Sequence, residues 1–217
     1  MAIAFDSSTK DAVGGTGTSH TTSFNNVAGN FMVVTSMSYT TNPGATTMTY
    51  NGVSMTQMGS NQTGGATPVY QYTFYLAKPA TGTNNIVTTT TNSLTNGFFD
   101  HVLSYSGVNT ASPIANNSQS TTANIGDTSV AVTIGNTGSS FAVWQLTGEL
   151  GRTYTAGANT VLRAGASDGQ ASSFDSNGIA SSSPWTLNAV IATGTEIKLL
   201  NAFELKAQIS SGFLNFM

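Results

Sequence analysis

Hydrophobic and polar residues alternate along most of the chain, and a period of two residues is typical of β-strands. The pattern predicts strands at residues 2–5, 20–24, 31–40, 46–50, 53–59, 69–76, 85–91, 98–105, 129–134, 140–146, 160–166, 170–175, 185–190 and 196–207. Turn-forming pairs rich in Gly, Asn and Asp separate these ranges at intervals of about 8–12 residues, which is the rhythm of sandwiches and jelly rolls. We therefore predict an all-β fold, an antiparallel β-sandwich of jelly-roll-like character in a single domain.

The stretch TMTYNGVSM at residues 47–55 gives the sharpest local prediction. Asn51-Gly52 is the dipeptide that most readily forms a type I′ hairpin turn, so Tyr50 should pair with Val53. This register sorts the neighbouring side chains onto two faces. The expected buried face holds Met48, Tyr50, Val53 and Met55, and the expected solvent face holds Thr47, Thr49, Ser54 and Thr56.

We predict one β-sandwich domain over residues 1–207, with no domain boundary inside it. The Ser/Thr/Asn-rich stretch 109–128 resembles a linker, but a linker there would leave each half as an open sheet, so we expect a long surface crossover. Residues 208–217 form a tail whose large apolar residues are unusual for a chain end: Phe213, Leu214, Phe216 and Met217. We expect this tail to dock on its own domain or, preferably, on a neighbouring subunit.

Composition excludes several classes of function. Charged residues make up only 7% of the 217 residues, and Thr, Ser, Asn and Gly take their place, as is common in extracellular and virion β proteins. The net charge is −3 and the few basic residues form no cluster, so nucleic acid is not an expected partner. The absence of cysteine excludes disulfides and thiolate metal sites.

The N-terminal residues MAIAFDSSTK contain no basic region followed by an apolar stretch, so they do not predict a signal peptide. No run of apolar residues approaches the length of a membrane span. A virion protein would combine an extracellular style of surface with the absence of a signal, because such proteins are made in the cytoplasm. We therefore expect the protein in a virion, with the bacterial cell surface or the extracellular space as the alternative.

Several segments resemble a widespread β-sandwich module. The segments that carry the resemblance are AFDSST, HTTSFNNVAGNFMVVTSMSYT, TTMTYNGVSMTQMGS, YQYTFYLAKPATGTNNIVTTTT, FFDHVLSYSGVNTASP, TSVAVTIGNTGSSFAVWQL, SPWTLNAV and FELKAQ. Similar modules occur in bacterial surface proteins, secreted multi-domain proteins and phage structural proteins. The resemblance implies a sandwich fold and an adhesive, carbohydrate-associated or structural role, and it implies no catalytic residues. The chain departs from the module in lacking a signal, neighbouring modules and an anchor, which favours an assembly subunit.

Catalytic chemistry is not indicated. Asp100 and His101 are adjacent in FFDHVLSYS, but neighbours on a strand point to opposite faces and cannot converge on one substrate. If Phe99 and Leu103 face the core, His101 is an inner histidine and Asp100 an exposed charge. No GxSxG motif supports a serine nucleophile. We expect a protein that is not an enzyme.

We expect no cofactor, although one loop region offers oxygen ligands. Asp168-Gly169, Asp175 and Asn177 form a loop rich in the oxygen atoms that calcium prefers. Turn chemistry alone also explains these residues, so calcium stays an alternative.

Binding of glycans needs an exposed aromatic ring and nearby polar side chains. Tyr154 is the best candidate for an exposed ring, beside Arg152 in ELGRTYTAG, and Asp168 and Asp175 are further candidate ligands. Trp144 and Trp185 are expected in the core.

Together these features favour a non-enzymatic structural or surface subunit of a phage or virus particle. It would associate with itself as a homo-oligomer and with other particle proteins. The alternative is a carbohydrate-binding or adhesin module of a bacterial surface protein.

Overall fold

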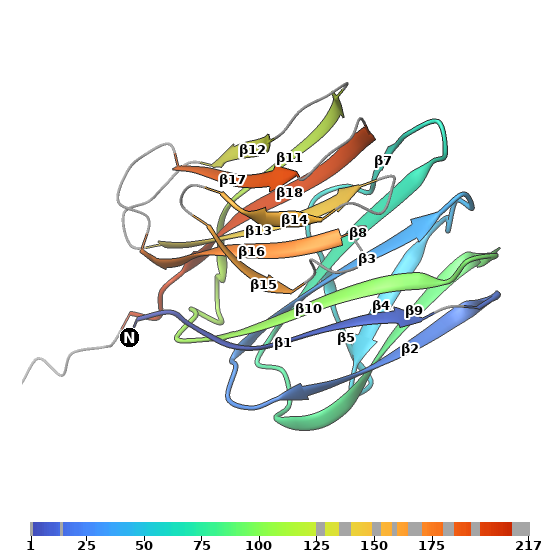
Figure 1. The fold of residues 1–217 in the computed structure, drawn as a ribbon. Coiled ribbons are helices and arrows are strands. Elements are labelled where there is room, and N and C mark those ends of the chain that lie inside the picture. Colours follow the sequence, from blue (N-terminus) through green and yellow to red (C-terminus); the bar gives the residue numbers. More distant parts are fainter. Residues whose placement is uncertain are drawn as a thin grey trace, which may run out of the picture.

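The computed structural model confirms an all-β, antiparallel sandwich (Figure 1). It describes residues 2–13, 15–124, 129–134, 140–148, 153–157, 160–164, 171–179, 185–191 and 196–209. Every regular element within these ranges is a strand.

The first half of the chain forms β1 (Ala4–Val13), β2 (Gly17–Asn26), β3 (Phe31–Tyr39), β4 (Thr46–Tyr50), β5 (Val53–Ser54), β6 (Thr56–Gln57), β7 (Gln62–Gly64), β8 (Val69–Ala77), β9 (Gly82–Leu94) and β10 (Phe98–Ser106). The second half forms β11 (Ile114–Asn124), β12 (Ser129–Ile134), β13 (Ser140–Gly148), β14 (Tyr154–Ala156), β15 (Val161–Ala164), β16 (Ala171–Ile179), β17 (Trp185–Ile191) and β18 (Glu196–Lys206).

The strands form four sheets. The N-inner sheet has the order β1-β10-β3-β8, with β6 and β7 both paired to β8 at its far edge, and the N-outer sheet has the order β2-β9-β4-β5. The C-inner sheet has the order β11-β18-β13-β16-β15, and the C-outer sheet has the order β12-β17-β14.

The sheets stack in the order N-outer, N-inner, C-inner, C-outer. Tyr50 and Phe74 belong to one apolar cluster that joins the two N-terminal sheets. Phe31 and Phe203 belong to a second cluster between the two inner sheets. Trp144 joins a third cluster, between the C-inner and C-outer sheets, which confirms its predicted place in the core. Both faces of each inner sheet are therefore buried.

The two halves of the chain repeat one strand order. The order β1-β10-β3-β8 in the N-inner sheet matches β11-β18-β13-β16 in the C-inner sheet, and β2-β9-β4 matches β12-β17-β14 in the outer sheets. Even an irregularity is repeated, because β1 shifts register just after Phe5 and β11 shifts register just after Ile114. The contacts of β1 with β15 correspond to those of β7 with β11, so an approximate two-fold axis relates the halves.

The hairpin around Asn51-Gly52 forms as predicted. The φ angles are 48° at Asn51 and 75° at Gly52, and Tyr50 pairs with Val53. Its buried face holds Tyr50 and both neighbouring methionines, but Val53 is 55% exposed instead of buried. Because β5 has only two residues and lies at the sheet edge, Val53 has no layer to cover it.

The prediction of a surface crossover at residues 109–128 is wrong. Most of this stretch forms β11, which pairs with β18 along its whole length. A strand at a sheet edge needs few apolar side chains, because main-chain hydrogen bonds hold it to its neighbour. The connection between the two halves is therefore only the short segment between Ser106 and Ile114.

Candidate functional site

Asp100 and His101 point to opposite faces of the N-inner sheet, as predicted, but both are buried. Asp100 is 1% exposed and faces the N-outer sheet, where it accepts a hydrogen bond of 2.7 Å from the Thr22 hydroxyl and another from the Ser36 hydroxyl. The prediction of an exposed Asp100 is wrong, because a second sheet covers this face. Burial raises the pKa of the Asp100 carboxyl above its usual value, against the effect of these two hydroxyls.

His101 is an inner histidine, as predicted. Its Nδ1 lies 3.3 Å from the Ser173 hydroxyl across the interface between the inner sheets, and that hydroxyl donates to Gln145 Oε1. Because the Ser173 hydroxyl donates its proton to Gln145, its oxygen serves as the acceptor in the contact with His101. This chain of polar contacts joins the two halves of the molecule. It gives no access to a substrate, because all three side chains are buried.

The aromatic platform proposed for glycan binding is not exposed. Tyr154 is fully buried in the cluster between the C-inner and C-outer sheets, so the prediction that its ring is available to a ligand is wrong. Arg152 and Asp168 lie outside the described residues, and so do all four apolar residues of the predicted assembly tail, Phe213, Leu214, Phe216 and Met217.

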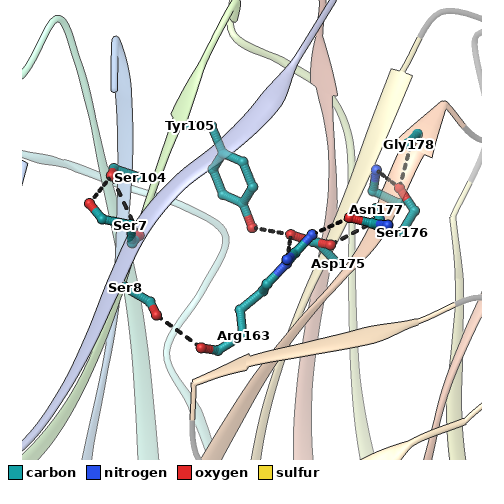
Figure 2. A network of polar contacts seen from close by, with 10 residues as sticks. Ser7, Ser8, Ser104, Tyr105, Arg163, Asp175, Ser176, Asn177 and Gly178 are labelled. Atoms are coloured by element: carbon teal, nitrogen blue, oxygen red, sulfur yellow. Dashed lines mark hydrogen bonds and ion pairs between the residues drawn. The ribbon is translucent and has the colours of Figure 1, made fainter. Parts of the chain in front are cut away.

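Asp175 belongs to β16 and is fully buried rather than placed in a loop (Figure 2). Arg163 Nε donates to its Oδ2 at 2.7 Å, and the Tyr105 hydroxyl donates to the same atom at 3.2 Å. The Arg163 guanidinium also lies 4.4 Å from the centre of the Phe5 ring. The backbone N–H of Asn177 donates to Asp175 Oδ1. These contacts satisfy the carboxylate and join the first half of the chain to the second, so Asp175 has a structural role.

No group of three or more His, Cys, Asp or Glu side chains in the described part of the chain is placed to hold a metal ion. Within the same residues, no helix is long and apolar enough to cross a membrane.

The outer face of the N-outer sheet is exposed to solvent along β2, β9 and β4. Its strands carry hydroxyl and amide groups in cross-strand rows: Ser19 with Thr89 and Thr47, Thr21 with Val87 and Thr49, and Ser23 with Asn85. None of these residues is charged. The face can therefore contact a neutral surface without the desolvation of an ion.

β2 forms one edge of this sheet. It pairs with β9 on one side and has no second partner strand among the described residues. Its sequence GTSHTTSFNN has no proline and no acidic or basic residue apart from His20, which is buried. Natural edge strands usually carry charges, proline or a covering segment that prevents pairing with another chain. Along its length, β2 has neither an exposed charged residue nor a proline.

The corresponding edges of the inner sheets are protected. β1 carries Asp6, Lys10 and Asp11, and the Ser8 hydroxyl donates to the Arg163 carbonyl of the facing sheet. β11 has no charge, but Gln62 Nε2 donates to the Ser120 carbonyl. The edge of β2 and the hydroxyl-rich face beside it together form the candidate functional site.

Comparison of the chain with protein-family models, with curated proteins and with solved structures finds no match. The site must therefore be interpreted from its own chemistry. Sequence analysis predicted the core of β2 but could not identify its free edge, since strand order is not encoded in the alternation of one strand.

Proposed function

We propose that the protein is a non-enzymatic structural subunit of a phage or virus particle and that copies of it associate through the edge of β2. The observation that carries the proposal is an edge strand of 10 residues, with no acidic residue, Lys, Arg or Pro, at the rim of an uncharged sheet. One contact reaches it from β1, where the Ser7 hydroxyl donates to the Asn25 carbonyl at 3.2 Å. An edge of this kind offers a row of backbone donors and acceptors to another strand.

Pairing between two identical edges has a simple geometry. An antiparallel β2–β2 pair places the same surface of each copy in contact, so it closes as a two-fold dimer. The two N-outer sheets would then form one continuous sheet. The hydroxyl side chains of Thr21 and Ser23 would face their counterparts in the partner without introducing a like charge.

The virion location rests on composition. A chain with 7% charged residues and no cysteine, folded into a four-layer stack, matches the properties that particle proteins need outside the cell. We propose contact through the apolar tail, at residues 213–217, as a second interface of the same subunit. The alternative function, a carbohydrate-binding or adhesin module centred on Tyr154, loses its main support because that ring is buried.

Charged variants of β2 test the interface. We expect the wild-type chain to form a discrete oligomer in multi-angle light scattering. Thr21→Lys with Ser23→Lys should give monomers, because like charges would face each other across the shared edge. Thr21→Glu with Ser23→Glu should do the same. An equimolar mixture of the two variants should associate again, because opposite charges then face each other.

Thr47→Lys with Thr49→Lys is the matched control, since these residues lie on the same face but on the inner strand β4. Its mass should equal that of the wild type. A monomeric wild type, or charged β2 variants that keep the wild-type mass, would contradict the proposal. If deletion of residues 212–217 gives monomers while the charged β2 variants keep the wild-type mass, the interface is the tail and not β2.

A further inference from the structure

A hollow of about 380 Å³ lies beside the Asn51-Gly52 turn, where β9 begins. Its lining is Asn51, Gly52, Thr83, Asn84, Asn85 and Val87. None of these residues is charged, and four of them carry an amide or hydroxyl side chain. The volume falls within the range of small-molecule sites, about 300–1,000 Å³.

One residue of the lining, Asn84, is held from the core. Asn84 Nδ2 lies 3.2 Å from the hydroxyl of the fully buried Tyr50, and that hydroxyl donates to the Ala80 carbonyl at 3.1 Å. These contacts use the amide nitrogen of Asn84, which also lies 3.3 Å from the Thr81 and Gly82 carbonyls, and they fix its side chain on the side of β9 that faces Tyr50. The rim is fixed as well, because the Asn51 backbone N–H donates to the Asn85 carbonyl at 3.0 Å.

The remaining polar groups are available to a ligand. The side chains of Asn51, Thr83 and Asn85 make no hydrogen bond to any residue in the described part of the chain. Each amide offers both a donor and an acceptor, and the threonine hydroxyl does the same. Val87 adds an apolar surface at one side of the hollow.

We propose that this hollow binds a neutral saccharide. Adjacent hydroxyls on a sugar ring both donate and accept, which matches amide and hydroxyl groups fixed close together, and the C–H groups of the ring can pack on Val87. A phosphate or carboxylate would find no cationic partner in the lining, and an ammonium group would find no anionic one. The inference does not depend on the proposed assembly function.

Saturation-transfer NMR tests the site on the full-length chain. The probes are maltotetraose, cellotetraose and chitotetraose, each offered separately. We expect saturation transfer to at least one of them, with weak affinity, because the hollow is open and lacks an exposed aromatic ring. The variants are Asn85→Ala, which removes an exposed amide from β9, and Asn51→Gly, which removes an amide while glycine keeps the left-handed turn.

Each variant should weaken binding about two- to tenfold, the effect of losing one neutral hydrogen bond. Asn96→Ala is the control, because Asn96 is an exposed asparagine just beyond the other end of β9, and this variant should bind as the wild type does. Absence of saturation transfer to all three probes would overturn the proposal, and so would binding that both hollow variants retain unchanged. Light scattering on the same variants should show the wild-type mass, which separates failure of this site from failure of the β2 interface.

Discussion

At the scale of single residues, the four-layer stack explains why polar side chains are buried on both faces of the inner sheets. Asp100 and His101 are neighbours on β10, and each reaches a different interface. Asp100 accepts hydrogen bonds from the Thr22 and Ser36 hydroxyls, and His101 Nδ1 contacts the Ser173 hydroxyl. A carboxyl in such a place should make stability depend on pH.

Asp100→Asn tests this dependence. The pKa of Asp100 is raised by burial, so as the pH rises above 3.8 the unfolded chain ionises first and the folded state loses relative stability until the pH passes the raised pKa. The amide removes this loss. In urea unfolding at a series of pH values, the free energy of unfolding of the variant relative to the wild type should therefore increase from acid to neutral pH. A constant difference would contradict the burial of a raised-pKa carboxyl.

Asp6→Asn should show the opposite sign. Burial favours a higher pKa for Asp6, but hydrogen bonds from Ser104, Ala28, Ser7 and Gly29 together hold it below its usual value of 3.8. The stabilisation from this carboxylate is present above 3.8 and is lost as the pH falls through the lowered pKa. The variant should therefore be less stable than the wild type at neutral pH, and the difference should shrink toward acid pH. Equal stability at all pH values would contradict the prediction.

The ion pair between Arg163 and Asp175 gives a third residue-scale prediction. Arg163→Met leaves a fully buried carboxylate without its cation, and losses of about 3–5 kcal/mol are typical of such changes. Tyr105→Phe removes only one neutral donor to the same oxygen and should cost about 1 kcal/mol. Chemical denaturation of both variants measures the difference. Equal effects of the two substitutions would show that the ion pair is not the main contact.

Sequence reasoning at this scale succeeded where the cause was local. The Asn51-Gly52 turn was predicted because the dipeptide itself favours left-handed φ angles. Asp100 and Tyr154 were misplaced because their burial depends on a second layer contributed by distant strands. The hollow beside the turn was missed for the same reason, since Asn51 and Asn85 come together only when β4 pairs with β9.

At the scale of elements, the strands with apolar alternation were predicted, the short strands β7 and β14 were not, and neither was β11. Its sequence IANNSQSTTAN contains few apolar residues, and its place is set by pairing with β18 and by polar contacts to the loop before β7. The short connection that this leaves between the halves passes through Gly107. Its φ of 73° is in the left-handed region, and an added Cβ would lie 2.1 Å from the Ala2 carbonyl oxygen.

Replacing such a glycine by alanine has two costs, backbone strain at a positive φ angle and a steric clash of the added Cβ. Comparing Gly107→Ala with Gly52→Ala separates them. Gly52 has a φ of 75° and open space around an added Cβ, so alanine there should cost about 1 kcal/mol from backbone strain. At Gly107 the same strain is joined by a clash with backbone, which should add about 1–3 kcal/mol. Urea midpoints measure both. If Gly107→Ala is no more destabilising than Gly52→Ala, the close approach to Ala2 is not present in solution.

At the scale of the whole molecule, the repeated strand order and the approximate two-fold axis suggest two halves that fold independently. The packing between the halves indicates instead that they fold as one unit. The halves meet at the interface between the inner sheets, which contains Phe31, Leu103, Phe141 and Phe203. Removing one half would expose this apolar face of the other. The sequence could not reveal the duplication, because the halves share pairing order and bulge position rather than a visible repeat of residues.

Scanning calorimetry should therefore show one unfolding transition for the full chain, with equal calorimetric and van't Hoff enthalpies. Leu187→Ala removes a buried side chain from the core between the C-inner and C-outer sheets. Met48→Ala removes one from the core between the N-inner and N-outer sheets. Each should lower the stability by about 2–5 kcal/mol, as is usual for buried Leu or Met, and should move the whole transition. If the halves were independent, the wild type would show two transitions and each substitution would move only one. That result would mean that the interface between the inner sheets is too weak to couple them, despite its aromatic core.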